Sequence, residues 1–162
     1  TYFYPDSIPM LRENWQDTLV LVIDAWDKDG SHTLTEGNGT LRTYYASDSL
    51  QEESEYVLGV KSGMSREFYP AGNKKSEGEF RSGVKHGEWN YWFSNGKLVK
   101  IDHFDKGKLH GSYKVWFPNE QLEVEGFYDQ GKKDSLWIWY DRSGRKDMEG
   151  FFENDLRFLR QL

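Results

Sequence analysis

Residues 83–96 read GVKHGEWNYWFSNG, and this stretch decides the fold because its pattern returns along the chain. A shift of 24 residues aligns it with residues 107–119, which read GKLHGSYKVWFPN. A second aromatic series recurs at the same interval and comprises Tyr56, Phe80, Phe104, Tyr128 and Phe152. A fixed period of this length is the sequence signature of a tandem-repeat protein.

Further copies of the pattern extend over residues 30–155. The later copy contains Gly131, Ser135, Trp137, Tyr140 and Gly144, and the earlier copy contains Gly59, Gly63, Phe68, Tyr69 and Gly72. The first copy keeps Gly39, Leu41, Tyr44 and Tyr45, but Thr35 takes the place of its first glycine. The repeat therefore governs most of the chain.

Each copy has the composition of one β-hairpin. Residues 89–93 are rich in aromatic side chains, which favour pleated, half-buried strands. Asn95-Gly96 predicts a two-residue turn with positive φ at both positions, followed by a return strand over residues 97–104. The glycines of residues 107–111 predict the next turn, because glycine adopts conformations closed to other residues.

Successive hairpins with short connections become antiparallel neighbours. We therefore expect an all-β fold, a single-layer, twisted antiparallel meander sheet of tandem 24-residue hairpins with a cap at each end. The N-terminal cap, residues 1–29, is expected to contain a short helix over residues 6–17 and a strand over residues 18–26. The expected repeats are 30–53, 54–77, 78–101, 102–125 and 126–149, with a partial copy at 150–155 and a C-terminal cap at 156–162.

The aromatic residues divide between two faces, because alternate residues of a strand point to opposite sides. Trp89, Tyr91 and Phe93 share one face, whereas Trp92 points to the other. Packing is the simplest role for these rings, but a partly exposed aromatic band would bind a protein or a glycan. The candidate partner-binding residues are Trp89, Tyr91, Trp92, Tyr113, Trp116, Trp137, Trp139 and Tyr140.

The pattern Gly-x-x-x-Gly-x-Trp-x-x-Trp-Phe-x-Asn-Gly, with a Tyr or Phe before it, resembles the bacterial variant of the MORN repeat. The closest copies are residues 83–96 and 107–119, and the chain departs from the pattern at Ser135, Glu120 and Asp141. The resemblance implies a hairpin-repeat sheet that binds proteins or surfaces, and it implies no catalytic residues. Some relatives are described as antitoxin components, and others as exported or envelope proteins.

The charge balance argues against nucleic acid as a partner. The chain has 21 basic and 27 acidic side chains, a net charge of −6. Residues 1–60 contain three of the basic and eleven of the acidic side chains, so no part forms a basic footprint for nucleic acid or anionic membranes. Direct membrane insertion is not expected, since no apolar run approaches eighteen residues.

The histidines and acidic residues predict turns rather than a metal site. His86 and His110 occupy one repeat position, which elsewhere holds Asn38, Ser62 and Asp134, and small polar residues that interchange in this way are turn formers. Asp27-Lys28-Asp29-Gly30 resembles the start of a calcium loop, but Asn38 stands where that loop needs glutamate. We therefore expect no metal and no cofactor.

Catalysis is not expected either. The chain has no cysteine, no phosphate-binding glycine loop and no serine nucleophile motif. The acid pairs Glu52-Glu53 and Glu123 with Glu125 lie in strands or loops, and a meander sheet offers them no cleft.

The leading functional hypothesis is a non-enzymatic protein-interaction or scaffold module that presents an aromatic sheet to a macromolecular partner. Three alternatives remain open: an antitoxin-like protein, an accessory subunit of an exported or cell-envelope assembly, and a glycan-binding surface. The resemblance favours an exported or envelope location, with a cytoplasmic one still open. The residues do not identify the partner.

Overall fold

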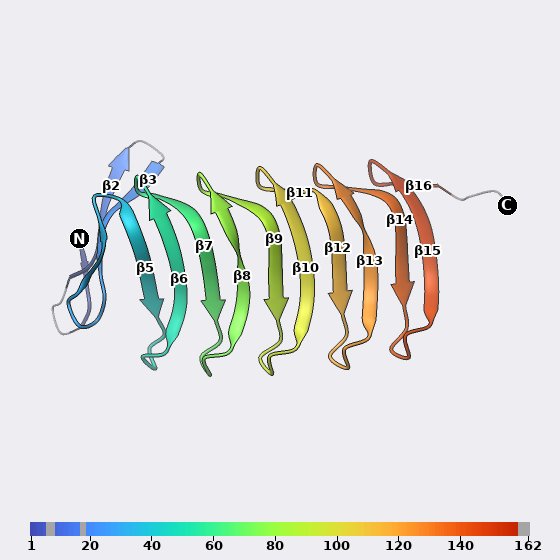
Figure 1. Ribbon diagram of the computed structural model, residues 1–162, viewed down its shortest axis with the longest axis horizontal. Coiled ribbons are helices and arrows are strands. Elements are labelled where there is room, and N and C mark those ends of the chain that lie inside the picture. Colours follow the sequence, from blue (N-terminus) through green and yellow to red (C-terminus); the bar gives the residue numbers. More distant parts are fainter. Residues whose placement is uncertain (6–8, 17–18, 159–162) are drawn as a thin grey trace. The chain divides into compact units, whose positions relative to one another are not determined.

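The computed structural model describes residues 1–5, 9–16 and 19–158. Over these residues the chain is all β, and its sixteen strands follow one another as an open antiparallel meander with no helix (Figure 1). The strands pair in chain order, except that β11 branches off from β10. This confirms the fold class expected from the repeat.

The strands are short, and most have eight or nine residues. They are β1 (Tyr2–Phe3), β2 (Pro9–Gln16), β3 (Leu19–Trp26), β4 (His32–Thr35), β5 (Asn38–Tyr44), β6 (Leu50–Val57), β7 (Val60–Phe68), β8 (Lys74–Arg81), β9 (Val84–Trp92), β10 (Leu98–Asp105), β11 (Lys108–Leu109), β12 (Gly111–Trp116), β13 (Leu122–Asp129), β14 (Lys132–Tyr140), β15 (Lys146–Glu153) and β16 (Leu156–Phe158).

The chain divides into two compact units. The first contains residues 1–72 and 79–84, and the second contains residues 73–78 and 85–162. In the part of the chain that the structure describes, no helix is long and apolar enough to cross a membrane.

The helix expected in the N-terminal segment is wrong, because Pro9–Gln16 forms strand β2. β2 pairs with β3, whose sequence LVLVIDAW is rich in β-branched residues and requires a hydrogen-bonding neighbour. Leu11 of β2 also packs against the buried residues Val22, Ala25 and Leu34. The rest of the predicted helix, residues 6–8 and 17, lies outside the described residues.

One class of hairpin turn has two residues with positive φ, and it recurs once per repeat. The first residue of each turn has φ between 46° and 51°, and the second between 69° and 90°. This is the type I′ turn, whose twist matches that of the flanking strands. The turns are Glu36-Gly37, Leu58-Gly59, Ser82-Gly83, Lys106-Gly107, Gln130-Gly131 and Asn154-Asp155.

The tight turns also link successive hairpins. The backbone N–H of the second turn residue donates to a carbonyl 22 residues earlier, so Gly83 bonds to Lys61, Gly107 to Lys85 and Gly131 to Leu109, at 2.7–3.0 Å. Asp155 donates to Lys133 in the same way. The tip of each hairpin is therefore fastened to the outgoing strand of the hairpin before it.

The first two tight turns are closer in sequence than the 24-residue period predicts. Thr35 was expected in the position of the turn glycine, but the turn glycine is Gly37, only 22 residues before Gly59. A Cβ atom at Gly37 would overlap the backbone of Gly59, so the close approach of these two turns requires glycine.

The other class of turn has three loop residues, of which only the last is left-handed. In residues 93–97 the Phe93 carbonyl accepts from the Gly96 N–H at 2.9 Å, and the Phe93 N–H donates to the Lys97 carbonyl at 2.8 Å. Asn95 does not have positive φ, and its Oδ1 accepts from the Lys97 N–H instead. The prediction of a turn at Asn95-Gly96 is confirmed, but the two-residue type is wrong.

The left-handed position of these three-residue turns is not always glycine. It is occupied by Gly30, Asp48, Gly72, Gly96, Glu120 and Gly144, with φ between 67° and 87°. Residues with a Cβ are strained in this conformation. The conformation of Glu120 therefore lowers the stability of this turn. The exposed ion pair of its carboxylate with Lys97, at 3.3 Å, offsets part of this loss.

We predict that Glu120→Gly raises the free energy of unfolding by about 0.5 kcal/mol at high salt, where the Lys97 ion pair is screened. Chemical denaturation measures the change. The control is Glu120→Gln, which removes the charge and keeps the strained conformation. An equal gain in both variants would contradict an effect of backbone strain.

The core of the second unit consists of tryptophan rings lying over glycines. Trp89 is 3% exposed and Trp137 is 1% exposed. A Cβ atom at Gly78 would overlap the Trp89 ring, and one at Gly126 would overlap the Trp137 ring. The Trp137 indole N–H is also satisfied, because it donates to the Phe127 carbonyl at 3.1 Å. Each ring thus fills the space that the neighbouring glycine leaves open.

We predict that Gly126→Ala lowers the free energy of unfolding by about 3 kcal/mol, because the Trp137 ring has to move away from its buried position. Gly131→Ala is the matched control, since a Cβ there meets nothing within 4 Å and only the backbone conformation, φ 90°, is strained. Thermal unfolding with near-ultraviolet circular dichroism reports both stability and the tryptophan environment. Equal losses in the two variants would contradict the ring-on-glycine packing.

Candidate partner-binding surface

The repeat strands present two faces, which we define by their aromatic residues. The first face carries Trp89, Tyr91, Tyr113, Trp137 and Trp139. The Trp89 ring contacts that of Tyr91, and the Trp137 ring contacts those of Tyr113 and Trp139. The second face carries Trp92, Trp116 and Tyr140, which have the opposite position in the strand alternation. Phe93, expected beside Trp89, lies in a turn rather than in a strand.

Part of the first face is a ring cluster within the second unit. Tyr113, Tyr128 and Trp137 lie with ring centroids 5.0–5.4 Å apart, and both contacts of Tyr128 are edge-to-face. Phe152 extends the cluster, at 6.3 Å from Trp137 and 6.2 Å from Trp139. These are the separations at which aromatic pairs stabilise a protein beyond the area they bury.

Lysines of the same chain cover much of this face. The Lys85 ammonium lies 3.9 Å from the Trp89 ring centroid and 5.3 Å from that of Phe104, and it donates to the Tyr91 hydroxyl at 2.9 Å. The Lys133 ammonium lies 4.4 Å from Trp137 and 5.4 Å from Phe152. Such cation–π contacts are favourable, and they occupy ring faces that would otherwise meet solvent or a partner.

These lysines were not among the residues predicted for the surface, although the sequence contains a signal for them. Lys61, Lys85 and Lys133 occupy the same position of the 24-residue repeat. Lys61 follows the same pattern, since its ammonium pairs with Glu52 and lies 5.2 Å from the Phe80 ring. The recurrence of a lysine four residues before Trp89 and Trp137 predicts a cation over the ring.

Among the eight candidate residues, Trp89 and Trp137 are buried and have a packing role. The other six are half-buried: Tyr91, Trp92, Tyr113, Trp116, Trp139 and Tyr140. These six can contribute side-chain surface to a partner, and their role in binding stays a prediction.

Trp92, Trp116 and Tyr140 form a row on the second face, 24 residues apart in sequence. Trp92 lines a shallow hollow of about 240 Å³ with Asn73, Lys74 and Gly96, and the Lys74 ammonium lies 5.1 Å from its ring. Tyr140 donates its hydroxyl to Glu125 at 2.7 Å, and this hydrogen bond raises the pKa of Tyr140. Polar partners thus hold the outer rings of the row in place.

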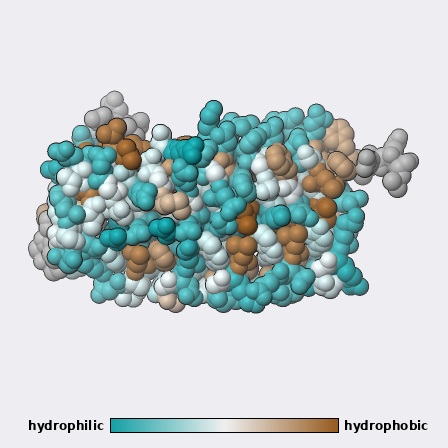
Figure 2. All heavy atoms as spheres, viewed as in Figure 1, coloured by the Kyte–Doolittle hydropathy of each residue, from teal (hydrophilic) through white to brown (hydrophobic). Residues whose placement is uncertain are grey.

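Figure 2 shows one side of the molecule, where strongly hydrophobic side chains form separate patches among hydrophilic ones. Interfaces that form and dissociate have this mixed character, whereas permanent interfaces are more uniformly apolar.

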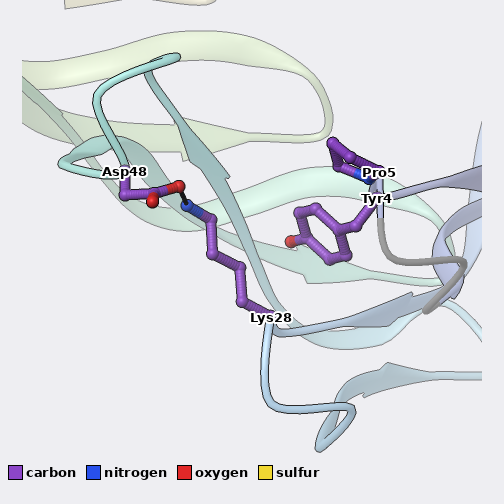
Figure 3. A pocket seen from close by; sticks show the side chains of 4 residues that line it. All are labelled: Tyr4, Pro5, Lys28 and Asp48. Atoms are coloured by element: carbon purple, nitrogen blue, oxygen red, sulfur yellow. Dashed lines mark hydrogen bonds and ion pairs between the residues drawn. The ribbon is translucent and has the colours of Figure 1, made fainter.

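The first unit contains an open pocket of about 250 Å³ lined by Tyr4, Pro5, Lys28 and Asp48 (Figure 3). Lys28 and Asp48 form an ion pair across it, and the Lys28 ammonium lies 4.4 Å from the Tyr44 ring. The charged groups of this pocket therefore neutralise one another, and they join two turns of the first unit.

Asp27, beside this pocket, belongs to a turn, as the sequence predicted. Its N–H donates to the Ser31 carbonyl at 2.8 Å, and its carboxylate accepts from Tyr44 and Arg42. Burial alone would raise the pKa of Asp27, but the hydrogen bonds from Tyr44, the Lys28 N–H and Arg42 together lower it. The same hydrogen bond and the burial of the phenol raise the pKa of Tyr44.

The histidines do not lie in the tight turns, so that prediction is wrong. His86 is in β9, and His110 lies between β11 and β12. His86 approaches Asp105 at 3.9 Å, and His110 approaches Asp129 at 3.0 Å. Over the residues that the structure describes, three or more histidine and acidic side chains do not gather anywhere as a metal site needs.

These features define a class, the tandem β-hairpin repeat proteins, whose hairpins form one meander sheet with aromatic residues on both faces. Residues 38–57, 85–106 and 109–130 match the MORN repeat variant. The chain is thus a member of the MORN repeat variant family with three matched repeats. No curated protein matches the chain.

We predict that alkaline pH destabilises the protein through Tyr113. Burial first, and then the nearby Asp102 carboxylate, raise the pKa of Tyr113 from 10.0 to about 12. The folded state therefore holds the phenol proton more tightly than the unfolded state does. The stability that this proton contributes is complete below pH 10 and is lost as the pH rises towards 12.

Chemical denaturation between pH 9 and pH 12 tests this prediction on the wild type and Tyr113→Phe. The free energy of unfolding of the variant is expected to fall less steeply with pH, because one of the perturbed phenols is gone. Tyr56, whose pKa burial also raises to about 12, remains in both proteins, as do Tyr44, Tyr128 and Tyr140, whose pKa values are raised as well. These phenols account for the residual decline. Identical slopes would contradict the assignment to Tyr113.

Proposed function

We propose that this protein is a non-enzymatic protein-interaction module whose partner binds the second face along Trp92, Trp116 and Tyr140. The observation that carries the proposal is the half-exposure of these three rings at one repeat position, while Trp89 and Trp137 of the first face are buried. Tryptophan and tyrosine, together with arginine, are enriched among the few residues that supply most of the binding energy at protein interfaces.

The repeat geometry supports a protein as the partner. MORN repeats generally serve as protein-interaction modules and are typically not catalytic, and this chain has three of them. Equivalent rings on neighbouring hairpins offer a partner several similar contacts in a row, and a repeat array extends such contacts over a long surface. The polar neighbours of the rings, such as Glu125 and Lys74, provide the hydrogen-bonding rim of an interface.

The more specific roles follow from the identity of the partner. In an antitoxin-like role the partner is a cognate toxin, and in an envelope role it is a subunit of an exported assembly. A glycan partner would stack its sugar rings on the same side chains and bond its hydroxyl groups to their polar neighbours. The experiment below separates a protein partner from a glycan.

Site-specific photo-crosslinking in cells of the natural source tests the proposal. A benzophenone side chain at position 116 is expected to crosslink one protein, and the same group at position 112 provides a matched position on the same strand. The crosslinked protein is then purified and titrated against the wild type and Trp116→Ser by calorimetry. The wild type is expected to show saturable binding, weakened about tenfold or more in Trp116→Ser.

Two results would contradict the proposal. In one, position 116 yields no specific protein adduct while the chain binds a polysaccharide panel, which identifies a glycan binder. In the other, the purified partner binds wild type and Trp116→Ser equally, which places the contact elsewhere.

A further inference from the structure

One repeat on the first face lacks the lysine whose ammonium group lies over the aromatic rings in other repeats. Lys61, Lys85, Leu109 and Lys133 occupy one repeat position, which holds Gly37 in the first repeat. Four residues on stand Trp89, Tyr113 and Trp137 after the last three of these, whereas Ser65 follows Lys61. Lys61, Lys85, Leu109 and Lys133 share their structural environment, because the carbonyls of all four accept the N–H of a tight turn. Leu109 therefore stands in the lysine position without an ammonium group.

The rings beside Leu109 are equivalent to those that the lysines cover. The Lys85 ammonium lies over Trp89 and Phe104, and the Lys133 ammonium lies over Trp137 and Phe152. The corresponding rings in the Leu109 repeat are Tyr113 and Tyr128, whose centroids are 5.3 Å apart in an edge-to-face arrangement. Both are half-buried, and no cation of the described chain lies over either ring.

A buried carboxylate lies beside the same rings. Asp102 is 2% exposed and stands in the repeat position that holds Gly78 and Gly126 in the neighbouring copies. Lys100 pairs with its Oδ2 atom at 2.7 Å, whereas its Oδ1 atom is buried and has no hydrogen-bond partner in the described structure. A carboxylate oxygen in this state favours a second positive charge nearby.

Other acidic groups strengthen this local field. The Tyr113 phenol interacts electrostatically with the carboxylates of Asp102 and Glu123. The Tyr128 phenol interacts in the same way with those of Asp155 and Asp102. The cations of the neighbouring repeats are already engaged, since Lys100 pairs with Asp102 and Lys133 lies over Trp137. Tyr113 and Tyr128 thus combine two aromatic rings with negative charge and lack the ammonium group found in the other repeats.

We propose that this position binds a lysine side chain of a partner protein, with its ammonium group over Tyr113 and Tyr128 in the place that Leu109 leaves without a cation. The inference rests on the proposed protein-binding role, but it concerns the first face and not the Trp92 row. The chain itself shows this geometry twice, with Lys85 and Lys133 each over two rings, while Lys61 lies over the single ring of Phe80.

Nuclear magnetic resonance titration of the whole protein tests this site directly. The probe is Nα-acetyl-lysine amide, and the readout is the aromatic proton–carbon spectrum. Saturable shifts are expected at the Tyr113 and Tyr128 rings and not at Trp89 or Trp137, which already have a lysine. The diacetylated probe, which has no charge, is expected to bind at least fivefold more weakly, as about 1 kcal/mol of cation–π energy implies.

Matched variants separate the site from general charge attraction. Leu109→Lys supplies the ammonium group within the chain and is expected to abolish the shifts, while Leu109→Met keeps a neutral side chain of similar volume and retains them. Asp102→Asn is expected to weaken the titration, and its own spectrum shows whether it is folded. Equal binding of the two probes, or full binding to Leu109→Lys, would overturn the proposal.

The titration does not depend on the crosslinking experiment at position 116. A failure of crosslinking with intact lysine binding rejects the Trp92 row and leaves this site standing. Once a partner is purified, its affinity for Leu109→Lys is expected to fall about fivefold or more relative to Leu109→Met. Equal affinities would show that the partner inserts no lysine here and would overturn the inference.

Discussion

The hydrogen bond from each tight turn to the preceding hairpin is the constraint on which the repeat depends. The N–H of Gly107 reaches the carbonyl of Lys85, and that of Gly131 reaches the carbonyl of Leu109. Where the residue that accepts this bond is lysine, its ammonium also lies over rings of the first face, as that of Lys85 does over Trp89. Lys85 and Lys133 thus join neighbouring hairpins through the backbone and cover aromatic rings through the side chain.

The thin sheet forces an unusual core. A single layer buries few side chains fully, so each large ring needs space made by a neighbour. Glycine provides that space at Gly78 and Gly126, and the rings that lie over them are buried. Asp102, in the repeat between them, is an exception. Its buried carboxylate takes the place of glycine, and its Oδ1 atom has no hydrogen-bond partner among the described residues. The repeat that carries Asp102 is also the one in which leucine replaces lysine, and both changes alter the charge beside Tyr113.

Much of the fold could be predicted from the sequence, because a 24-residue period with turn glycines admits one simple arrangement of hairpins. The division of Trp89 and Trp92 between two faces followed from strand alternation alone. The strand Pro9–Gln16 could not be predicted from its own composition, since its conformation depends on pairing with β3. The type of the turn at Asn95 was predicted wrongly because Asn-Gly occurs in both two-residue and three-residue hairpin loops. The pairing of the flanking strands selects the three-residue loop. Burial of Trp89 and Trp137 depends on glycines in neighbouring strands, which are distant in sequence.

Amide hydrogen exchange at the hairpin tips tests the account most directly. Turn amides that face solvent exchange rapidly, whereas amides in stable hydrogen bonds are protected. We expect the amides of Gly107 and Gly131 to be protected to the same degree as the strand amides, while those of the preceding turn residues Lys106 and Gln130 exchange rapidly. Rapid exchange at Gly107 and Gly131 in the folded protein would contradict the claim that these bonds hold successive hairpins together.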